Sequence, residues 1–171
     1  MTISAAVRGE DAQRALLLLL ERVGDRGIDE EDANIEDPPF NELLKTTWAT
    51  LERRGYVKDI GQYGPKHYQL TEEGWLKALA LSDQPETPEF TRRVQVLLQA
   101  LKRAVDERSG DGLLDVREIA SNTGLPLGWV WNGARAQLLD FLYPGRGYAL
   151  EMLDGVTVRV PADFGHEPID I

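Results

Sequence analysis

The sequence predicts a mostly helical α+β chain made of two similar domains, each with three helices followed by a two-stranded hairpin. Apolar residues recur at helical spacing on both sides of a polar stretch with two prolines, "SDQPETPEF" at residues 82–90. In each half a Gly–Tyr pair opens a hairpin directly after a helix, first at Gly55–Tyr56 and again 92 residues later at Gly147–Tyr148. The predicted domains are residues 1–84 and 85–171.

The first half contains the helices of the first domain. An amphipathic helix is expected to begin near Glu10 and to end at Gly27, because glycine commonly follows the last helical turn. The acidic segment 29–37 leaves room for a short second helix. Residues 41–55 form the next helix, for which Gly55 is the C-terminal cap. Its inner face is expected to consist of Phe40, Leu44, Trp48 and Leu51.

A hairpin and a closing helix complete the first domain. The segments "YVKDIGQ" and "KHYQLT" read as two short strands joined by "YGP", with Tyr68 and Leu70 facing inward. Thr71 is placed to cap the helix "EEGWLKALAL", since its hydroxyl can accept a hydrogen bond from the first turn.

The second half repeats this order of elements. The helix "EFTRRVQVLLQALKRAVDER" ends at "SGDG", and residues 114–142 read as helix, turn and helix, with the turn at "NTGLP". A hairpin with an Asp154–Gly155 turn follows; this dipeptide between alternating apolar residues is a strong hairpin signal. The inner face of the second of these helices is expected to consist of Val130, Ala134, Leu138 and Phe141.

The charge of the chain disfavours a broad nucleic-acid surface. The formal net charge is −10, with 10 basic and 16 acidic residues before Pro85 and a net charge of −4 after it. Affinity for DNA depends mainly on phosphate neutralisation by Lys and Arg. DNA binding would therefore need a local basic patch.

The residue types present argue against catalysis and against a bound metal or cofactor. The chain has no cysteine, and its two histidines, His67 and His166, lie far apart in the sequence. No Gly-Lys-Ser/Thr motif is present for a phosphate-binding loop. We therefore expect no catalytic residues, no metal site and no cofactor.

The apolar segments are too short for a membrane protein. The longest apolar run, "ALLLLL" at residues 15–20, falls well below the roughly 20 residues that cross a bilayer. The first residues lack the apolar core of a signal peptide. We expect a soluble, cytoplasmic protein that makes no membrane contact.

Both halves resemble winged-helix domains. The first is similar to winged-helix domains of bacterial regulators, including the MarR and PadR groups, over about residues 10–82. The residues that carry the resemblance are Leu51, Gly55, Tyr56, Val57, Tyr68, Leu70, Thr71 and Gly74. The second half resembles another winged helix-turn-helix through Ile119, Ala120, Thr123, Gly124, Leu125 and Val130. The resemblance implies two tandem winged helices, although the acidic segment 29–37 replaces a clean second helix.

The resemblance implies a DNA-binding surface on the first domain. In such domains the third helix enters the major groove and the wing touches phosphates or the minor groove. Residues of suitable chemistry here are Asn41, Lys45, Thr46, Thr50 and Arg53 on the helix, and Lys58 and Lys66 on the wing. A solvated helix face explains the same residues equally well.

The corresponding helix of the second domain has a different surface. It offers Trp129, Asn132 and Arg135 beside small residues, with few ligands for phosphate. Tryptophan on an exposed helix is a common anchor for protein partners, so these three residues are the predicted partner-binding or self-association site. The alternative is that Trp129 and Trp131 both pack against the wing or the other domain.

Two functions follow from these features. The first is a DNA-binding transcriptional regulator that uses the first winged helix, with the second domain for dimerisation or partner contact. The alternative is a protein–protein interaction adaptor that binds no DNA, similar in layout to the acidic ScpB-like subunits of bacterial chromosome-condensation complexes. The polar chemistry of the first helix and wing favours the regulator, whereas the net charge favours the adaptor.

Overall fold

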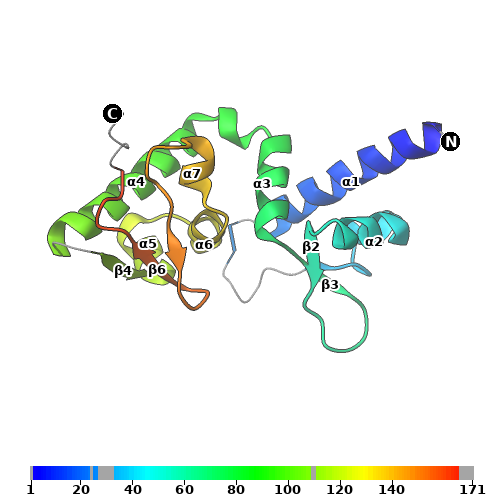
Figure 1. Cartoon of the computed structure of the whole chain (residues 1–171). Helices are drawn as coiled ribbons and strands as arrows, with labels where there is room; N and C mark the ends of the chain where they lie inside the picture. The colour runs from blue at the N-terminus through cyan, green and yellow to red at the C-terminus, as the bar shows by residue number, and fades with distance from the viewer. Residues whose placement is uncertain (1, 24, 27–32, 109–110, 166–171) are drawn as a thin grey trace. The chain divides into compact units, whose positions relative to one another are not determined.

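The chain forms two compact units, Met1–Pro85 and Glu86–Ile171. The computed structural model describes residues 2–23, 25–26, 33–108 and 111–165. Over these residues the fold is α+β, with seven α-helices and two three-stranded antiparallel sheets, one in each unit (Figure 1). A short 3-10 turn, η3 (Gln84–Glu86), lies at the junction of the two units. None of the described helices combines the length and the apolar character needed to cross a membrane.

The helices of the first unit are α1 (Thr2–Val23), α2 (Lys45–Arg53) and α3 (Glu72–Leu81), with a 3-10 turn, η2 (Phe40–Glu42), before α2. The first helix begins at Thr2, earlier than predicted, and its predicted cap Gly27 lies outside the described residues. Leu16, Leu19 and Leu20 of α1 are buried, because this helix packs against α2 and α3.

The predicted helix 41–55 is interrupted, so one predicted core residue is wrong. Leu43 and Leu44 have extended backbone conformations that separate η2 from α2. Leu44 precedes α2 and is 56% exposed, while Leu43 is buried in its place. Phe40, Trp48 and Leu51 are buried as predicted.

Gly55 ends α2 as predicted. Its φ of +80° is a left-handed conformation that glycine adopts without strain. The Gly55 amide donates to the Glu52 carbonyl at 3.1 Å, and the Tyr56 amide donates to the Leu51 carbonyl at 3.0 Å. This pair of bonds is the Schellman pattern, which satisfies the last carbonyls of the helix and turns the chain into the sheet.

The sheet of the first unit has one strand more than predicted. Its strands are β1 (Ala33–Asn34), β2 (Val57–Asp59) and β3 (His67–Leu70), in the order β1-β3-β2. The two residues of β1 come from the acidic segment and pair with Tyr68 and His67 of β3. A strand this short has no alternating pattern to read from the sequence. Tyr68 and Leu70 are buried as predicted.

Thr71 joins the sheet to α3 in the predicted way. Its hydroxyl oxygen accepts a hydrogen bond from the Gly74 amide at 3.0 Å, which caps the helix. The first turn of α3 approaches the residue before β2 so closely that a Cβ atom on Gly74 would lie 1.8 Å from the Tyr56 carbonyl oxygen. Glycine is therefore required at this position.

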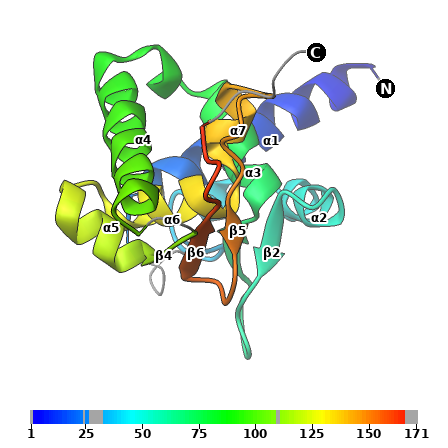
Figure 2. The same cartoon turned by 60° about the vertical axis from the view of Figure 1, so that its left-hand side comes forward.

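The second unit has the same strand topology as the first. Its elements are α4 (Pro88–Arg108), β4 (Gly112–Asp115), α5 (Val116–Thr123), α6 (Leu127–Arg135), α7 (Leu138–Leu142), β5 (Glu151–Met152) and β6 (Thr157–Val160). The sheet order is β4-β6-β5 (Figure 2). The strand β4 was not predicted, because it follows the helix-breaking "SGDG" and runs directly into α5. Asp115 caps α5 by accepting a hydrogen bond from the Arg117 amide at 2.8 Å.

The long helix that was predicted after "NTGLP" is divided into α6 and α7. The prediction that Phe141 is buried is wrong as a result. Gln137 separates α6 from α7 and adopts a φ of +56°. Its side chain donates to the Leu150 carbonyl and accepts from the Leu150 amide, both at 2.7 Å. The break shifts the helical register, so Leu139 is buried while Phe141 is 57% exposed. Val130, Ala134 and Leu138 are buried as predicted.

The predicted Asp154–Gly155 hairpin turn is present between β5 and β6. The Asp154 carboxylate accepts hydrogen bonds from the Val156 and Thr157 amides, at 3.2 and 2.7 Å. Glu151 and Arg159 form an ion pair across the two strands. The residues that direct this turn are therefore local in sequence, which explains why it was predictable.

Candidate nucleic-acid interface

The α2 helix presents a polar stripe to solvent. Lys45, Thr46 and Arg53 are exposed, and Thr50 is half-buried. The opposite face, Thr47, Trp48 and Leu51, is buried. The Thr50 hydroxyl donates to the Thr46 carbonyl at 2.8 Å, so it is available to a ligand as an acceptor. The four predicted residues of this helix therefore lie on one face.

Aromatic packing fixes α2 on the sheet. The Trp48 ring stacks on Tyr68 of β3 with 5.4 Å between ring centroids, and Phe40 meets Trp48 edge-on at 6.1 Å. The Trp48 Nε1–H donates to the Phe40 carbonyl at 3.3 Å. Because these three side chains are buried, the exposed stripe of α2 is held in one orientation.

A cleft of about 580 Å³ lies between α2 and the loop that joins β2 to β3. Asn41 and Lys45 line one side, and Gly64, Pro65 and Lys66 line the other. Asn41 lies on η2 and not on the helix, yet the fold brings it beside Lys45. Three of the predicted residues, Asn41, Lys45 and Lys66, thus share one cleft.

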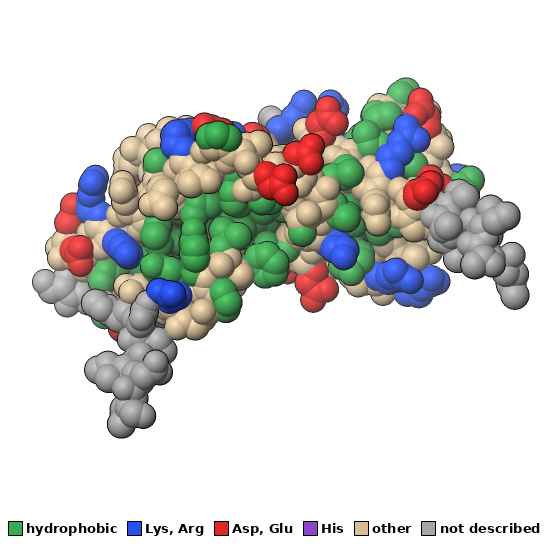
Figure 3. Space-filling view, turned by 90° about the horizontal axis from the view of Figure 1, so that it is seen from above, with side chains coloured by type: hydrophobic (Ala, Val, Ile, Leu, Met, Phe, Trp, Pro, Cys, Tyr) green, Lys and Arg blue, Asp and Glu red, His purple; other side chains and the backbone are tan. Residues whose placement is uncertain are grey.

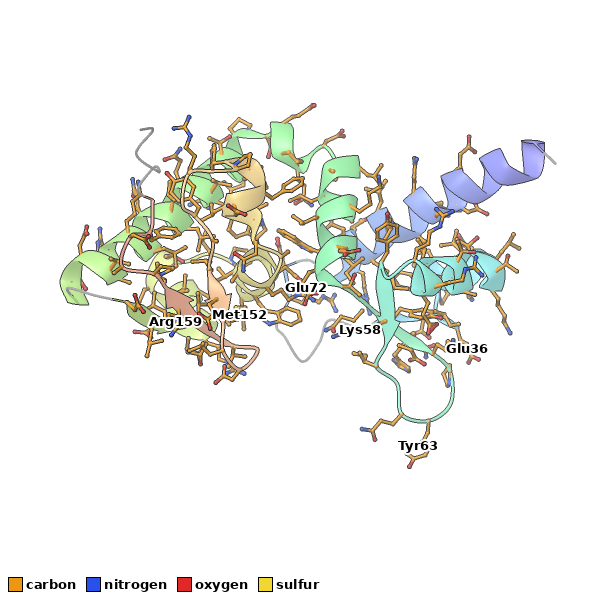
Figure 4. All side chains as sticks on the ribbon, in the orientation of Figure 1. Glu36, Lys58, Tyr63, Glu72, Met152 and Arg159 are labelled. Atoms are coloured by element: carbon orange, nitrogen blue, oxygen red, sulfur yellow. The ribbon has the colours of Figure 1, made fainter. Side chains whose placement is uncertain are left out.

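The β2–β3 loop, which the sequence predicted as the wing, is ordered at its base. Asp59 accepts hydrogen bonds from the Gly61 amide at 2.9 Å and the His67 amide at 3.1 Å. The Ile60 amide also donates to the His67 carbonyl at 2.8 Å. Tyr63 is 92% exposed and points away from the sheet at the tip of the loop (Figure 4). The predicted residue Lys58 is exposed on β2.

The order of this loop is expected to depend on pH through Asp59. The amides of Gly61 and His67 lower the pKa of Asp59 below its ordinary value of 3.8. The Asp59 carboxylate therefore stabilises the loop fully above about pH 4, and this stabilisation is lost as pH falls through the lowered pKa of Asp59. Hydrogen-exchange protection of the Gly61 and His67 amides should fall over that range.

The Asp59→Asn variant is the matched control for this pH effect. Its side-chain oxygen still accepts hydrogen bonds but does not titrate, so protection of the two amides should become independent of pH in the acid range. Equal pH dependence in the variant and the wild type would contradict the assigned role of Asp59.

Lys66 is already paired at the edge of the cleft. Its Nζ lies 2.9 Å from Glu52 Oε1, and the same oxygen accepts a hydrogen bond from the Tyr68 hydroxyl at 2.7 Å. The bond to Glu52 raises the pKa of Lys66 to about 12, and the two donors lower the pKa of Glu52. Burial, followed by the bond to Glu52, raises the pKa of Tyr68 to about 12. At neutral pH, Lys66 is therefore protonated, Glu52 is a carboxylate, and Tyr68 keeps its hydroxyl proton.

The predicted partner-binding site of the second unit is not exposed as expected. Trp129 is 1% exposed, with Phe90 edge-on to it at 6.3 Å and the Arg93 guanidinium 5.8 Å from its ring centroid. Asn132 is 2% exposed, and its side-chain nitrogen donates to the Gly128 carbonyl at 2.9 Å. Both side chains serve packing, so the prediction that they anchor a partner is wrong.

Arg135 and Trp131 pack together instead of forming an open surface. The Arg135 guanidinium lies 4.1 Å from the Trp131 ring centroid and donates twice to the Asn132 side-chain oxygen. The Trp131 Nε1–H donates to the Gly155 carbonyl in the β5–β6 turn at 2.9 Å. For Trp131 the alternative interpretation is therefore correct, since this side chain packs on the hairpin of its own unit.

Sequence reasoning missed Glu52 and Asp59, two carboxylates that shape the interface. Glu52 contacts the cleft residue Lys66 only because Lys66, 14 residues away, returns beside α2 through the hairpin. Asp59 had a local signal, since an acidic residue two positions before a glycine favours a turn in which its side chain accepts the glycine amide.

Comparison of the chain with protein-family models, curated proteins and solved structures gave no match. Within the described residues, no group of three or more histidine, aspartate or glutamate side chains is placed to hold a metal ion.

Proposed function

We propose that each unit is a winged-helix domain and that the chain is a DNA-binding transcriptional regulator. The first unit would bind duplex DNA through α2 and the β2–β3 loop. The shared order of elements supports the domain assignment. In both units a long helix precedes a strand, that strand pairs with the last strand of the unit, and a hairpin closes the sheet.

The observation that carries the proposal is the cleft between α2 and the β2–β3 loop. A duplex that placed its major groove on the exposed stripe of α2 would bring its backbone to this cleft. Lys45 at the cleft, Arg53 on the stripe and Lys58 on β2 are exposed, and no ion pair to them occurs among the described residues. Asn41, Thr46 and Thr50 add groups that hydrogen-bond to bases or phosphates.

The electrostatic contribution is local and modest. Lys45 and Arg53 are the exposed cations of α2, but Glu36, an exposed carboxylate, lines the same cleft. Lys58 lies on the opposite face of the sheet from Tyr68, which packs on α2 (Figure 4). The interface is therefore a small basic patch on a protein with a net charge of −10. A single winged helix supplies limited specificity, so we expect two copies to bind a two-fold site.

Fluorescence anisotropy of a labelled duplex of about 30 base pairs, titrated at salt from about 50 to 200 mM, tests the proposal. Two phosphate contacts, by Lys45 and Arg53, predict that the logarithm of the association constant falls with a slope of roughly −2 against the logarithm of salt concentration. Absence of duplex binding at the lowest salt concentration would contradict the proposal, because the attraction between the protein and the phosphates is strongest there.

A protein-interaction adaptor is the second candidate, and one observation favours it. Phe141 on α7 is 57% exposed and Tyr143, directly after this helix, is 41% exposed. Figure 3 shows hydrophobic side chains gathered on one face of the second unit. An exposed aromatic pair on an acidic protein suits a partner with an apolar, basic surface.

A further inference from the structure

The pairing of Lys66 bears on how strongly the cleft can bind DNA. Lys66 and Tyr68 both line the cleft, and both donate to the same oxygen of Glu52. The Lys66 Nζ also lies 5.7 Å from the centroid of the Tyr68 ring. The cation is therefore held by attractive contacts to the protein before any phosphate approaches.

Glu52 is held in place independently of Lys66. The Tyr68 ring is buried and stacked on Trp48, so its hydroxyl is a fixed donor. If Lys66 moved to a phosphate, Glu52 would keep the hydrogen bond from the cleft residue Tyr68 and stay beside it as a carboxylate without its cation. A like charge beside a phosphate is repulsive, and this repulsion offsets the gain from the new contact.

We propose that Glu52 limits the affinity of the cleft for the DNA backbone by withholding Lys66 from phosphate. This inference rests on the proposed function. Glu52 is a positioning residue in this scheme, because it acts through Lys66 and contacts no nucleotide itself. Lys66, which the sequence analysis assigned to a phosphate contact, then contributes little to phosphate binding in the wild-type protein.

The test compares the wild type with Glu52→Gln, Lys66→Gln and the double variant in duplex-binding titrations over a range of salt. A lysine that contacts phosphate contributes about −0.9 to the slope of log affinity against log salt. Lys66→Gln should barely change the slope in the wild-type background. In the Glu52→Gln background, Lys66→Gln should make the slope less steep by about 0.9. Glu52→Gln alone should raise the affinity for the duplex roughly 3- to 10-fold.

Glu73→Gln is the control for net charge, because it removes an exposed carboxylate from α3 without releasing a cation at the cleft. In Glu52→Gln the side-chain amide oxygen can still accept from the Tyr68 hydroxyl, so the fold should be retained, as urea unfolding would verify. An affinity gain in Glu73→Gln equal to that in Glu52→Gln would overturn the inference.

Failure of the inference and failure of the proposed function give different results. Loss of about 0.9 in slope on Lys66→Gln in the wild-type background would show that Lys66 already contacts phosphate, and would overturn the inference alone. An unchanged slope and an unchanged affinity in Glu52→Gln would also overturn the inference alone. Absence of duplex binding by both the wild type and Glu52→Gln would overturn the proposed function and the inference together.

Discussion

Replacing Lys45 and Arg53 together by glutamate is expected to weaken duplex binding about 100-fold, or about 1.4 kcal/mol for each position. Both side chains are exposed on the same face of α2, where they neither support the core nor pair with a described residue. The variant removes two cations from the proposed interface and adds two anions. The salt dependence should also decrease, by about one unit of slope for each lost phosphate contact.

A matched variant separates local contact from overall charge. Lys77 on α3 and Arg103 on α4 are also exposed, and glutamate at both positions changes the net charge by the same amount. We expect this variant to lose only a small part of the affinity, because the affected cations lie outside the cleft. Equal loss in the two variants would mean that net charge, and not the α2 surface, controls binding.

Gly74→Ala is expected to destabilise the first unit by about 3 kcal/mol or more, at the upper end of the cost of overpacking. The added Cβ would lie 1.8 Å from the carbonyl oxygen and 2.8 Å from the carbonyl carbon of Tyr56. Both are backbone atoms, so no change of side-chain rotamer relieves the contact. The start of α3 and the strand β2 must separate instead, which should disturb the base of the proposed wing.

Gly9→Ala is the control for this substitution, because Gly9 also lies within a helix but has no atom within 4 Å of an added Cβ. Alanine there should stabilise α1 by about 0.5–1 kcal/mol, through its better helix propensity. Hydrogen exchange of the amides in the first unit can follow both variants. A stability change of the same sign in both would contradict the close contact between Gly74 and Tyr56.

The parts of the fold that local chemistry determines were predictable. Thr71 capping α3, Gly55 ending α2 and the Asp154–Gly155 turn each depend on residues within a few positions of one another. The strands β1 and β4 were missed because each is defined by pairing with a distant strand. The breaks at Leu43–Leu44 and at Gln137 were missed for a similar reason, since bonds such as that from Gln137 to Leu150 cannot be read from helical periodicity.

The candidate site was predictable as a helix face but not as a cleft. Periodicity around Trp48 and Leu51 indicated which side of α2 faces solvent, and this placed Lys45, Thr46 and Arg53 correctly. The pairing of Lys66 with Glu52 depends on how the hairpin returns beside α2. The burial of Trp129 depends on Phe90 and Arg93 of α4, a helix well before it in the sequence.

Amide chemical-shift mapping of the isotope-labelled chain, titrated with a short duplex at low salt, tests the central claim most directly. It reports both whether DNA binds and which residues it contacts. The predicted result is a set of shifts confined to η2, α2 and the β2–β3 loop, with Lys45, Arg53 and Tyr63 among the largest. Shifts confined to the second unit, or none at all, would contradict DNA binding by the cleft between α2 and the β2–β3 loop.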